Sequence, residues 1–265
     1  MKKIIFILFL PLTILAQNTD IGVMLGGANY IGDLAPDVAY NETRPCGGLF
    51  VRNRLSPYFA LRHSLSYARI KGDDANFEFN RPRNLSFRSD IIEVASVVEF
   101  NFLPFGREIL TKNFTSYAFI GIAFFRHNPK TEFNGKWITL RPLGTEGQGL
   151  PGGKNYGLMQ VALPFGMGCK YNINDNWLIG AELGFRRAYT DYIDDVSTKY
   201  PDFNAAGIPD AMLVSDRSGE INGGKSLAAA GDARGNPDTK DWYVLAGITL
   251  AYRIIPPKAC NNNFY

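Results

Sequence analysis

The stretch from Ser89 to Pro104, SDIIEVASVVEFNFLP, constrains the fold of this chain more than any other. One parity is apolar and the other polar: Ile92, Val94, Val98, Phe100 and Phe102 alternate with Glu93, Glu99 and Asn101. Because side chains in a β-strand alternate between faces, the pattern predicts a strand with one apolar and one charged face. The predicted strand is about fourteen residues long, whereas strands of soluble sheets usually have five or six residues. This length and pattern predict a barrel wall with lipid outside and a polar lumen inside.

Seven further segments carry a related pattern, so the whole chain predicts eight strands. They cover about Asp20–Asn29, Gly48–Leu55, Tyr58–Lys71, Thr115–Arg126, Met159–Tyr171, Trp177–Arg186 and Trp242–Arg253. Glycines blur the faces of the first segment, and the fifth strand is apolar on both faces, so parity orients neither. We expect an all-β fold, an eight-stranded antiparallel transmembrane β-barrel with long extracellular loops and a filled lumen.

The connections between the predicted strands alternate between long and short. Those after the first, third, fifth and seventh strands are long, as in outer-membrane barrels with short periplasmic turns and long outer loops. The longest, residues 189–240, predicts a functional or partly helical extracellular insertion, with a candidate helical turn at Leu227 to Ala233. Aromatic residues fall at strand ends, as an interfacial girdle requires: Tyr58, Phe59, Phe100, Phe102, Tyr171, Trp177, Trp242 and Tyr252.

A soluble exported sandwich is the alternative fold. It would show the same alternation of apolar and polar residues. It explains neither the length of the strands nor the asymmetry of the loops, and we therefore favour the barrel.

The first residues, MKKIIFILFLPLTILAQ, have the composition of a secretory signal peptide. Lys2 and Lys3 precede an apolar run that ends at a small residue, Ala16, followed by Gln17. The run is too short for the alternative, a transmembrane anchor, which needs about twenty residues. We expect Sec-type export with cleavage near Ala16-Gln17, integral outer-membrane localisation, a signal peptide over 1–16, a barrel over 17–255 and a periplasmic tail over 256–265.

Charged residues occupy the inward parity of several predicted strands. Both signs are present, so the set predicts an interior network of ion pairs rather than a conducting pore. The network residues are Arg52, Arg54, Arg62, Glu93, Glu99, Glu182 and Arg186, with Asn101 and Lys170 also facing inward. A proton or ion path along these residues is the alternative.

Asn53 and His63 break the pattern, because both sit on the apolar parity of neighbouring strands. Asn53 falls near the periplasmic end, where lipid headgroups tolerate polar groups. For His63 we expect a bulge that turns it inward, or a different strand register. A contact with a partner inside the membrane is the alternative.

The sequence contains little that predicts chemistry. His63 and His127 are the only histidines, and neither has a nucleophile motif near it. Cys46, Cys169 and Cys260 have no metal spacing, and their pairing stays open. We expect no enzymatic activity, cofactor, metal or small-molecule substrate. The formal net charge of +3 falls to +1 once Lys2 and Lys3 leave with the signal peptide, which predicts no nucleic-acid partner. At Asp191, Asp194 and Asp195 we expect a solvated loop, and a calcium site is the alternative.

Four stretches carry a family resemblance: GGANYIGDL (26–34), NFLPFG (101–106), WITLRPLGTEGQG (137–149) and RRAYTDYIDDVSTKYPD (186–202). They resemble PorG-like outer-membrane proteins of the Bacteroidota type IX secretion system, over nearly the whole mature chain. The resemblance implies a structural outer-membrane subunit that organises a periplasmic ring made of a lipoprotein and its partner subunit. The alternative function is a small barrel acting as a surface adhesin or membrane-stability protein.

Barrel topology and resemblance together predict two further surfaces. Three of the stretches fall in outer loops and predict a packed extracellular cap, with Tyr189, Tyr192 and Trp137 as apolar anchors. Its residues are Tyr30, Gly32, Asp33, Trp137, Glu146, Tyr189, Asp191, Tyr192, Asp194 and Asp195. Contact with the periplasmic ring is expected at the opposite end, through Pro104, Phe105, Gly106, Pro256 and Pro257.

Overall fold

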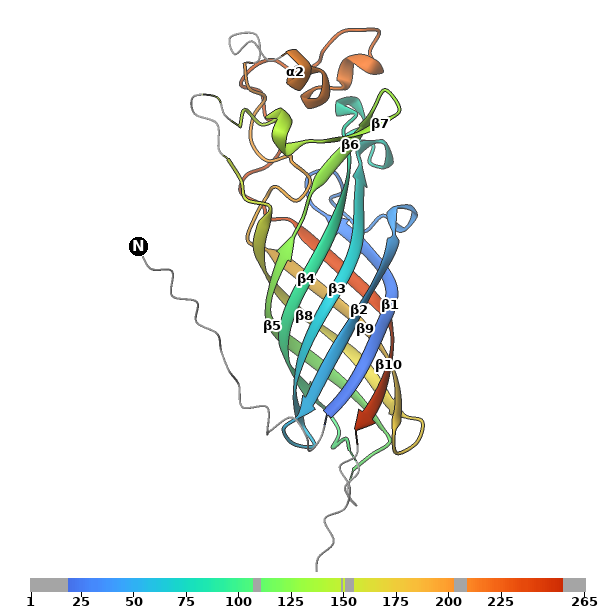
Figure 1. The fold of residues 1–265 in the computed structure, drawn as a ribbon. Helices are drawn as coiled ribbons and strands as arrows, with labels where there is room; N and C mark the ends of the chain where they lie inside the picture. The colour runs from blue at the N-terminus through green and yellow to red at the C-terminus, as the bar shows by residue number, and fades with distance from the viewer. Residues whose placement is uncertain (1–18, 107–110, 149, 151–154, 203–208, 255–265) are drawn as a thin grey trace, which may run out of the picture.

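The computed structural model describes residues 19–106, 111–148, 150, 155–202 and 209–254, which form a closed antiparallel barrel with a cap at one end (Figure 1). Eight strands make the wall: β1 (Thr19–Ile31), β2 (Arg44–Arg54), β3 (Phe59–Asp73), β4 (Ser86–Asn101), β5 (Phe114–Arg126), β8 (Met159–Asn172), β9 (Trp177–Ala188) and β10 (Trp242–Ile254). Each pairs with the next wall strand along the chain, and β1 pairs with β10 to close the barrel. The predicted fold class is confirmed.

Short connections gather at one end of the barrel, which we call the turn end (Figure 1). In the turn between β2 and β3, the amides of Leu55 and Ser56 donate to the Phe59 carbonyl at 2.9 and 3.0 Å. The Ser56 hydroxyl accepts from the Phe59 amide at 3.0 Å. In the turn between β8 and β9, the Asn174 side chain accepts from the Trp177 amide at 2.9 Å. Side-chain acceptors of this kind replace the missing ladder partners and keep such turns tight.

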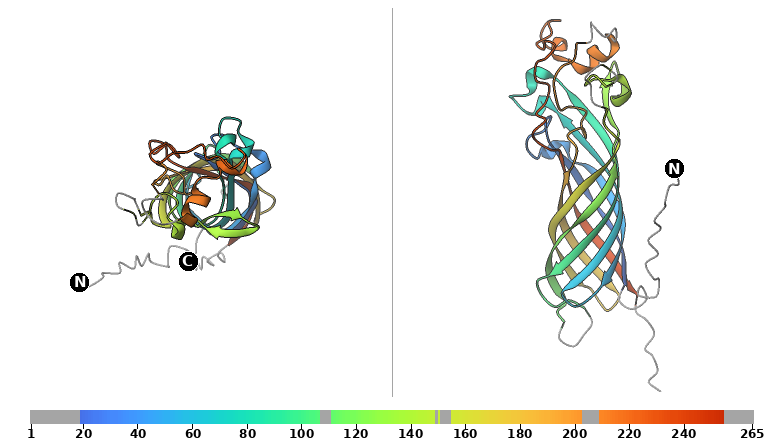
Figure 2. Two further views of the ribbon diagram at one scale, coloured as in Figure 1. Left: turned by 90° about the horizontal axis from the view of Figure 1, so that it is seen from above. Right: turned by 90° about the vertical axis from the view of Figure 1, so that its left-hand side faces the viewer.

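Longer connections gather at the opposite end and form the cap, residues 32–43, 74–85, 127–158 and 189–241, within the described ranges (Figures 1 and 2). Its regular elements are a hairpin of β6 (Pro129–Phe133) and β7 (Lys136–Thr139), helix α2 (Pro209–Ser215), and the 3₁₀ turns η2 (Tyr40–Glu42), η3 (Asp74–Asn76), η4 (Arg81–Arg83), η5 (Arg141–Leu143) and η6 (Ser218–Glu220). The helical turn expected at Leu227 to Ala233 is wrong, because that segment is irregular and the α-helix lies earlier in the same loop.

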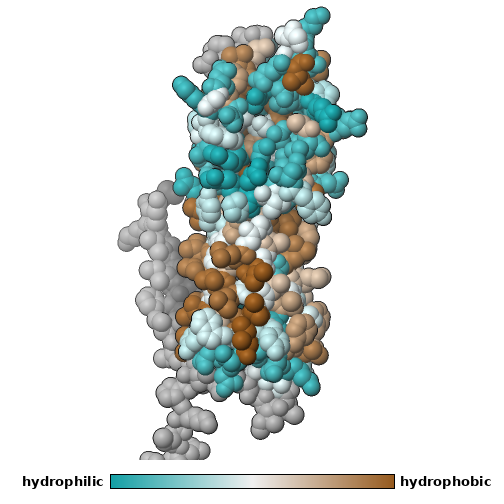
Figure 3. All heavy atoms as spheres, turned by 90° about the vertical axis from the view of Figure 1, so that its right-hand side faces the viewer, coloured by the Kyte–Doolittle hydropathy of each residue, from teal (hydrophilic) through white to brown (hydrophobic). Residues whose placement is uncertain are grey.

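The outer wall of the barrel carries an apolar belt between the cap and the turn end (Figure 3). Its exposed side chains are aliphatic with few exceptions: Ile21, Val23, Leu25, Leu49, Leu65, Ile92, Val94, Val98, Ile120, Ile122, Phe124, Met167, Ile179, Leu183, Ile248 and Leu250. Exposed aromatic residues ring the turn end: Tyr58, Phe59, Phe100, Phe102, Phe114, Tyr171, Trp177 and Tyr252. So large an exposed apolar surface is foreign to a soluble monomer and suits lipid.

His63 lies on this outer wall, so the expectation that a bulge or register shift turns it inward is wrong. The ladder runs unbroken through His63, which is opposite Val51 on β2 and Ser96 on β4. The imidazole Nδ1 lies 2.8 Å from the Ser96 hydroxyl, which also faces outward. A polar partner across the strand pair thus accommodates an imidazole among apolar side chains. Asn53 is likewise paired, accepting from the Thr19 hydroxyl at 3.0 Å.

The lumen is packed with side chains in layers. Charged and aromatic residues fill the half near the turn end, and small and apolar residues such as Ala28, Ala68, Ala123 and Leu245 fill the half below the cap. Among the described residues, no helix has the length and apolarity needed to cross a membrane.

Candidate functional site

A cluster of ion pairs around Glu99 lies in the part of the lumen near the turn end, two residues before the end of β4. The Glu99 carboxylate is fully buried and accepts from Arg52 Nε at 2.9 Å and from Lys170 Nζ at 2.6 Å. Arg62 Nε lies 3.1 Å from the other carboxylate oxygen. Three cations from three strands therefore converge on one carboxylate, which a low-dielectric interior favours only when every member is paired.

Arg62 links this cluster to a second carboxylate, Glu182 on β9. Its two Nη atoms both donate to Glu182, one of them at 3.1 Å to Oε1. The hydroxyl of Tyr117 donates to Oε2 of the same carboxylate at 2.7 Å. The fork geometry of a guanidinium fixes the relative position of β3 and β9 across the barrel.

Two smaller clusters of charged side chains also lie in the lumen. Toward the cap, Glu93 accepts from the Tyr243 hydroxyl at 2.6 Å and lies 3.4 Å from Arg186 Nε. Near the turn end, Asp20 lies 3.3 Å from Arg253, 3.7 Å from Arg54 and 3.8 Å from Arg52.

The structure thus places all seven predicted network residues in ion pairs: Arg52, Arg54, Arg62, Glu93, Glu99, Glu182 and Arg186. Lys170 joins them, as its inward parity indicated. Sequence reasoning missed Asp20 and Arg253. The signal for Arg253 was present, because it has the parity opposite to the apolar face of its strand.

Phe105 closes the lumen at the turn end, and its prediction as a surface contact for a partner is wrong. Its side chain is 2% exposed and packs with Phe50, Leu178 and Ala251. The ring lies 5.7 Å from Lys170 Nζ, so it covers the charged layer by a cation–π contact. Pro104 and Gly106 are half-buried, and Pro256 and Pro257 lie outside the described residues.

The cap holds a second polar cluster, built mainly from carboxylates. The Tyr30 hydroxyl, at the end of β1, lies 2.6 Å from Asp194 Oδ2 and 2.9 Å from Asp241 Oδ1. A phenol has one proton and can donate to one acceptor, so the second contact needs a proton from a carboxyl group. Burial raises the pKa of Asp194 and of Asp241 well above the ordinary value, and other cap carboxylates raise both further. The three groups therefore share protons.

The remaining cap carboxylates fix the YTDYIDDVSTKY loop in place. Glu146 accepts from Arg234 Nη1 at 2.6 Å and from the Thr198 amide at 3.0 Å. Asp195 accepts from the hydroxyls of Thr145 and Tyr156, and burial raises its pKa to about 6. Asp195 has a positive φ of 69°, a conformation that aspartate tolerates better than most residues.

Asp191 and Asp33 complete the set. Asp191 accepts from the Ser197 hydroxyl at 2.7 Å, and burial raises its pKa to about 7. Asp33 accepts from the Asn236 amide at 3.1 Å, and burial raises its pKa to about 6. A side chain at Gly32 would collide with the Tyr30 hydroxyl, so glycine is required there.

The three predicted apolar anchors of the cap behave differently. Tyr192 stacks on Tyr156 with ring centroids 4.7 Å apart. Tyr189, however, is 64% exposed, and Trp137 is 43% exposed with the Arg88 guanidinium 3.7 Å from its ring centroid. Those two anchors are wrong. Tyr156, which no periodic pattern marks, packs at the centre instead.

Metal-ligating and nucleophilic side chains of the described residues are scattered over the barrel and the cap. Among them, no group of three or more His, Cys, Asp or Glu side chains has the geometry to hold a metal ion. His63 is on the outer wall, and His127 is buried in the cap, where burial lowers its pKa to about 4. Cys46 and Cys169 are free thiols, and Cys260 lies outside the described residues.

Comparisons with known proteins give one family match and several distant similarities to solved structures. A model of the family described as "Domain of unknown function (DUF6089)" matches residues 1–208. None of the curated protein sequences compared with the chain matches it. Similar solved structures include the outer membrane protein OprG from Pseudomonas aeruginosa, at 8% identity and TM-score 0.44, covering 91% of this chain and 97% of that one. Neisserial surface protein A gives 9% identity and TM-score 0.43, covering 88% and 95%. The attachment invasion locus protein Ail of Yersinia pestis gives 11% and 0.42, covering 89% and 98%.

Proposed function

The chain belongs to the family described as Domain of unknown function (DUF6089), and we propose that this member is a non-catalytic outer-membrane barrel that serves type IX secretion as a structural subunit. The apolar belt supports the membrane part of this proposal, because every wall strand exposes apolar side chains and such a band suits lipid. The turn end would face the periplasm and the cap the exterior.

The observation that carries the structural role is the lumen filled with paired charges. Glu99 and Glu182 hold cations from opposite walls, and Phe105 covers the layer at the turn end. Such an interior stiffens the barrel and leaves its charges bound to each other, which suits an anchor better than a conduit.

The type IX assignment rests on the four resembling stretches. The most specific of them, residues 189–200, forms the centre of the cap, where Asp191, Asp194 and Asp195 are all buried. The segment therefore has a structural role at the centre of the cap. Partners would be the outer-membrane lipid, the ring lipoprotein and its partner subunit.

Exposed apolar residues at the turn end supply the contact surface for the ring. Leu103 is 42% exposed and Ile173 is 53% exposed, on two different turns. We propose these positions in place of Phe105, together with Pro104 and Gly106. Pro256 and Pro257 of the tail remain part of the proposed contact.

Site-specific photocrosslinking in cells tests the assignment. A photoreactive amino acid at Leu103 or Ile173 is expected to crosslink to the ring lipoprotein or its partner, and the same group at Tyr40 on the cap is not. A lack of ring crosslinks from both turn positions would contradict the secretion role. Crosslinks from Tyr40 to surface ligands alone would favour the adhesin alternative.

A further inference from the structure

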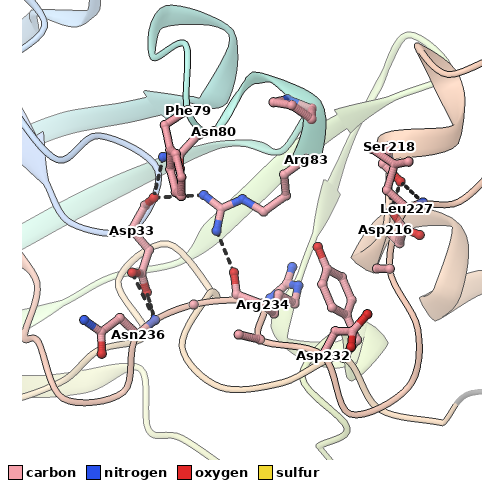
Figure 4. A pocket seen from close by; sticks show the side chains of 15 residues that line it. Asp33, Phe79, Asn80, Arg83, Asp216, Ser218, Leu227, Asp232, Arg234 and Asn236 are labelled. Carbon is pink, nitrogen blue, oxygen red and sulfur yellow. Dashed lines mark hydrogen bonds between the residues drawn. The ribbon is translucent and has the colours of Figure 1, made fainter.

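A cavity of about 530 Å³ opens in the cap, between the β3–β4 connection and the loop that precedes β10 (Figure 4). Its walls include Phe79, Arg83, Tyr200, Leu227, Asp232 and Arg234. The volume lies within the range of pockets that bind small molecules. None of the roles described so far uses it.

Polar groups on the floor of the cavity are left available. Arg234 is 3% exposed, and its Nε and Nη1 donate to Ser215 and Glu146 at 3.2 and 2.6 Å. Its Nη2 and the hydroxyl of the buried Tyr200 have no hydrogen-bond partner among the described residues. One carboxylate oxygen of Asp232 accepts from the Ala229 amide at 2.8 Å, and the other oxygen is left to accept from a ligand. Asp232 is exposed, and all three residues line the cavity, so these groups are open to it and can hydrogen-bond to the polar atoms of a ligand.

The cavity wall is held rigid by Arg83 (Figure 4). Its guanidinium donates to both oxygens of Asp74, at 2.8 and 2.7 Å. It also donates to the backbone carbonyls of Asp33 and Arg234 and so joins three loops. A wall fixed in this way loses little conformational entropy when a ligand binds.

Apolar side chains line the mouth. Phe79 is 95% exposed and Leu227 is 59% exposed, although both lie in the polar cap. Lipid explains the exposed side chains of the belt but not these two. An exposed ring beside a polar floor matches a ligand with one apolar face and several polar atoms.

The charge of the lining narrows the ligand class. Asp33, Asp216 and Asp232 would repel an anion, since Arg83 and Arg234 are already paired with Asp74 and Glu146. A cation offers no acceptor atom to Arg234 Nη2 or to the Tyr200 hydroxyl, and the polar atoms of the floor disfavour a purely apolar ligand. A neutral molecule with many hydroxyl groups satisfies donors and acceptors together.

We propose that this cavity binds a neutral sugar unit, stacked on Phe79 and hydrogen-bonded by Tyr200, Asp232 and Arg234. If the sugar belongs to a surface polysaccharide, the cap must face the exterior, as proposed above. Sugar binding by the purified protein does not require that orientation, so the sugar proposal and the secretion proposal can fail independently.

Saturation-transfer NMR on the purified barrel tests the proposal, in an amine-oxide detergent that carries no sugar headgroup. The probes are glucose, galactose, mannose and N-acetylglucosamine, with sulfate and succinate as competitors. We expect transfer to at least one sugar, about tenfold weaker affinity for Phe79→Ala and about fivefold weaker affinity for Tyr200→Phe. Tyr40→Ala removes another highly exposed cap aromatic, 88% exposed, and should bind as the wild type does.

Heat-modified gel mobility verifies that each variant is folded. The proposal is overturned if no sugar shows transfer, if sulfate or succinate displaces it, or if Tyr40→Ala weakens it as much as Phe79→Ala.

Discussion

The lumen and the cap both bury charged side chains, but they neutralise them differently. In the lumen each carboxylate meets guanidinium or ammonium groups, as Glu99 meets Arg52, Arg62 and Lys170. In the cap the carboxylates outnumber the cations within reach. The Tyr30 hydroxyl lies between Asp194 and Asp241. The Asn236 amide donates to Asp33, and the Ser197 hydroxyl donates to Asp191.

The difference follows from access to protons. A membrane-embedded interior must carry its compensating charges on its own side chains, because bulk water and its protons are remote. A cap in contact with solvent can take up protons and neutralise a surplus of acids. We therefore expect the barrel to respond strongly to loss of a charge partner, and the cap to respond to pH.

Glu99→Gln should have the largest effect. It leaves Arg52, Arg62 and Lys170 without their shared carboxylate, and an unpaired buried charge costs about 3–5 kcal/mol. The free energy of unfolding can be followed by urea titration of the heat-modified gel shift. Glu132→Gln, on the exposed face of the β6–β7 hairpin, is the matched control. Equal midpoints for the two variants would show that the network is not stabilising.

Phe105→Ala ranks second. Its buried ring packs with Phe50 and Leu178, and truncation of a buried phenylalanine costs about 3 kcal/mol or more. The same urea titration measures the change. Phe102→Ala, three residues earlier and 55% exposed, should cost less. An inverted order would argue that Phe105 is a surface residue after all.

The stability of the cap should decrease as pH rises, by less than the two substitutions above change the stability of the barrel. Its carboxyl groups have folded-state pKa values raised from 3.8, to about 6 for Asp195 and about 7 for Asp191. The folded cap therefore binds protons more tightly than the unfolded one. Its stability is greatest below pH 4 and declines as pH rises through about 6 to 7.

Hydrogen exchange checks this at two amides, Ile193 and Val196, which donate to Asp241 and Asp194 at 2.8 and 2.9 Å. Their protection, corrected for intrinsic rates, should fall between pH 5 and 8, whereas that of barrel amides should not. Asp194→Asn should flatten the pH response. A response common to cap and barrel would remove the contrast between them.

Asp90→Asn should have the smallest effect. Asp90 pairs with Arg69 at 2.6 Å on the outer wall near the cap, with side chains 31% and 37% exposed. Solvent screening limits such pairs to below about 1 kcal/mol. The urea midpoint should stay close to that of the wild type, and a loss comparable to that of Glu99→Gln would contradict the ranking.

The alternation of apolar and polar residues predicted the barrel because the two faces of each strand meet different environments. Apolar residues are favoured on the face toward lipid, and polar residues are favoured on the face toward the lumen. Glu99, Arg62 and Glu182 could be assigned to one interior on that ground alone. Asp20 was missed because Gly22, Gly26 and Gly27 weaken the contrast in β1.

Loops impose no such period, and the cap and plug were therefore harder to predict. Nothing local marks Phe105 as a lumen plug or Tyr156 as a stacking centre, since their partners are distant in sequence. Tyr189 and Trp137 were predicted to be apolar anchors of the cap because they are aromatic, although aromatic side chains in such proteins are also found at the surface. His63 is tolerated outside by Ser96, a partner from another strand.

The most direct test of the central claim, a lumen closed by its own ion pairs, is ion conductance in a planar lipid bilayer. Purified protein whose insertion has been verified by heat-modified mobility should give no steady current at moderate voltage. A stable conductance from the wild-type barrel, proportional to voltage and to salt concentration, would show an open lumen and contradict the account.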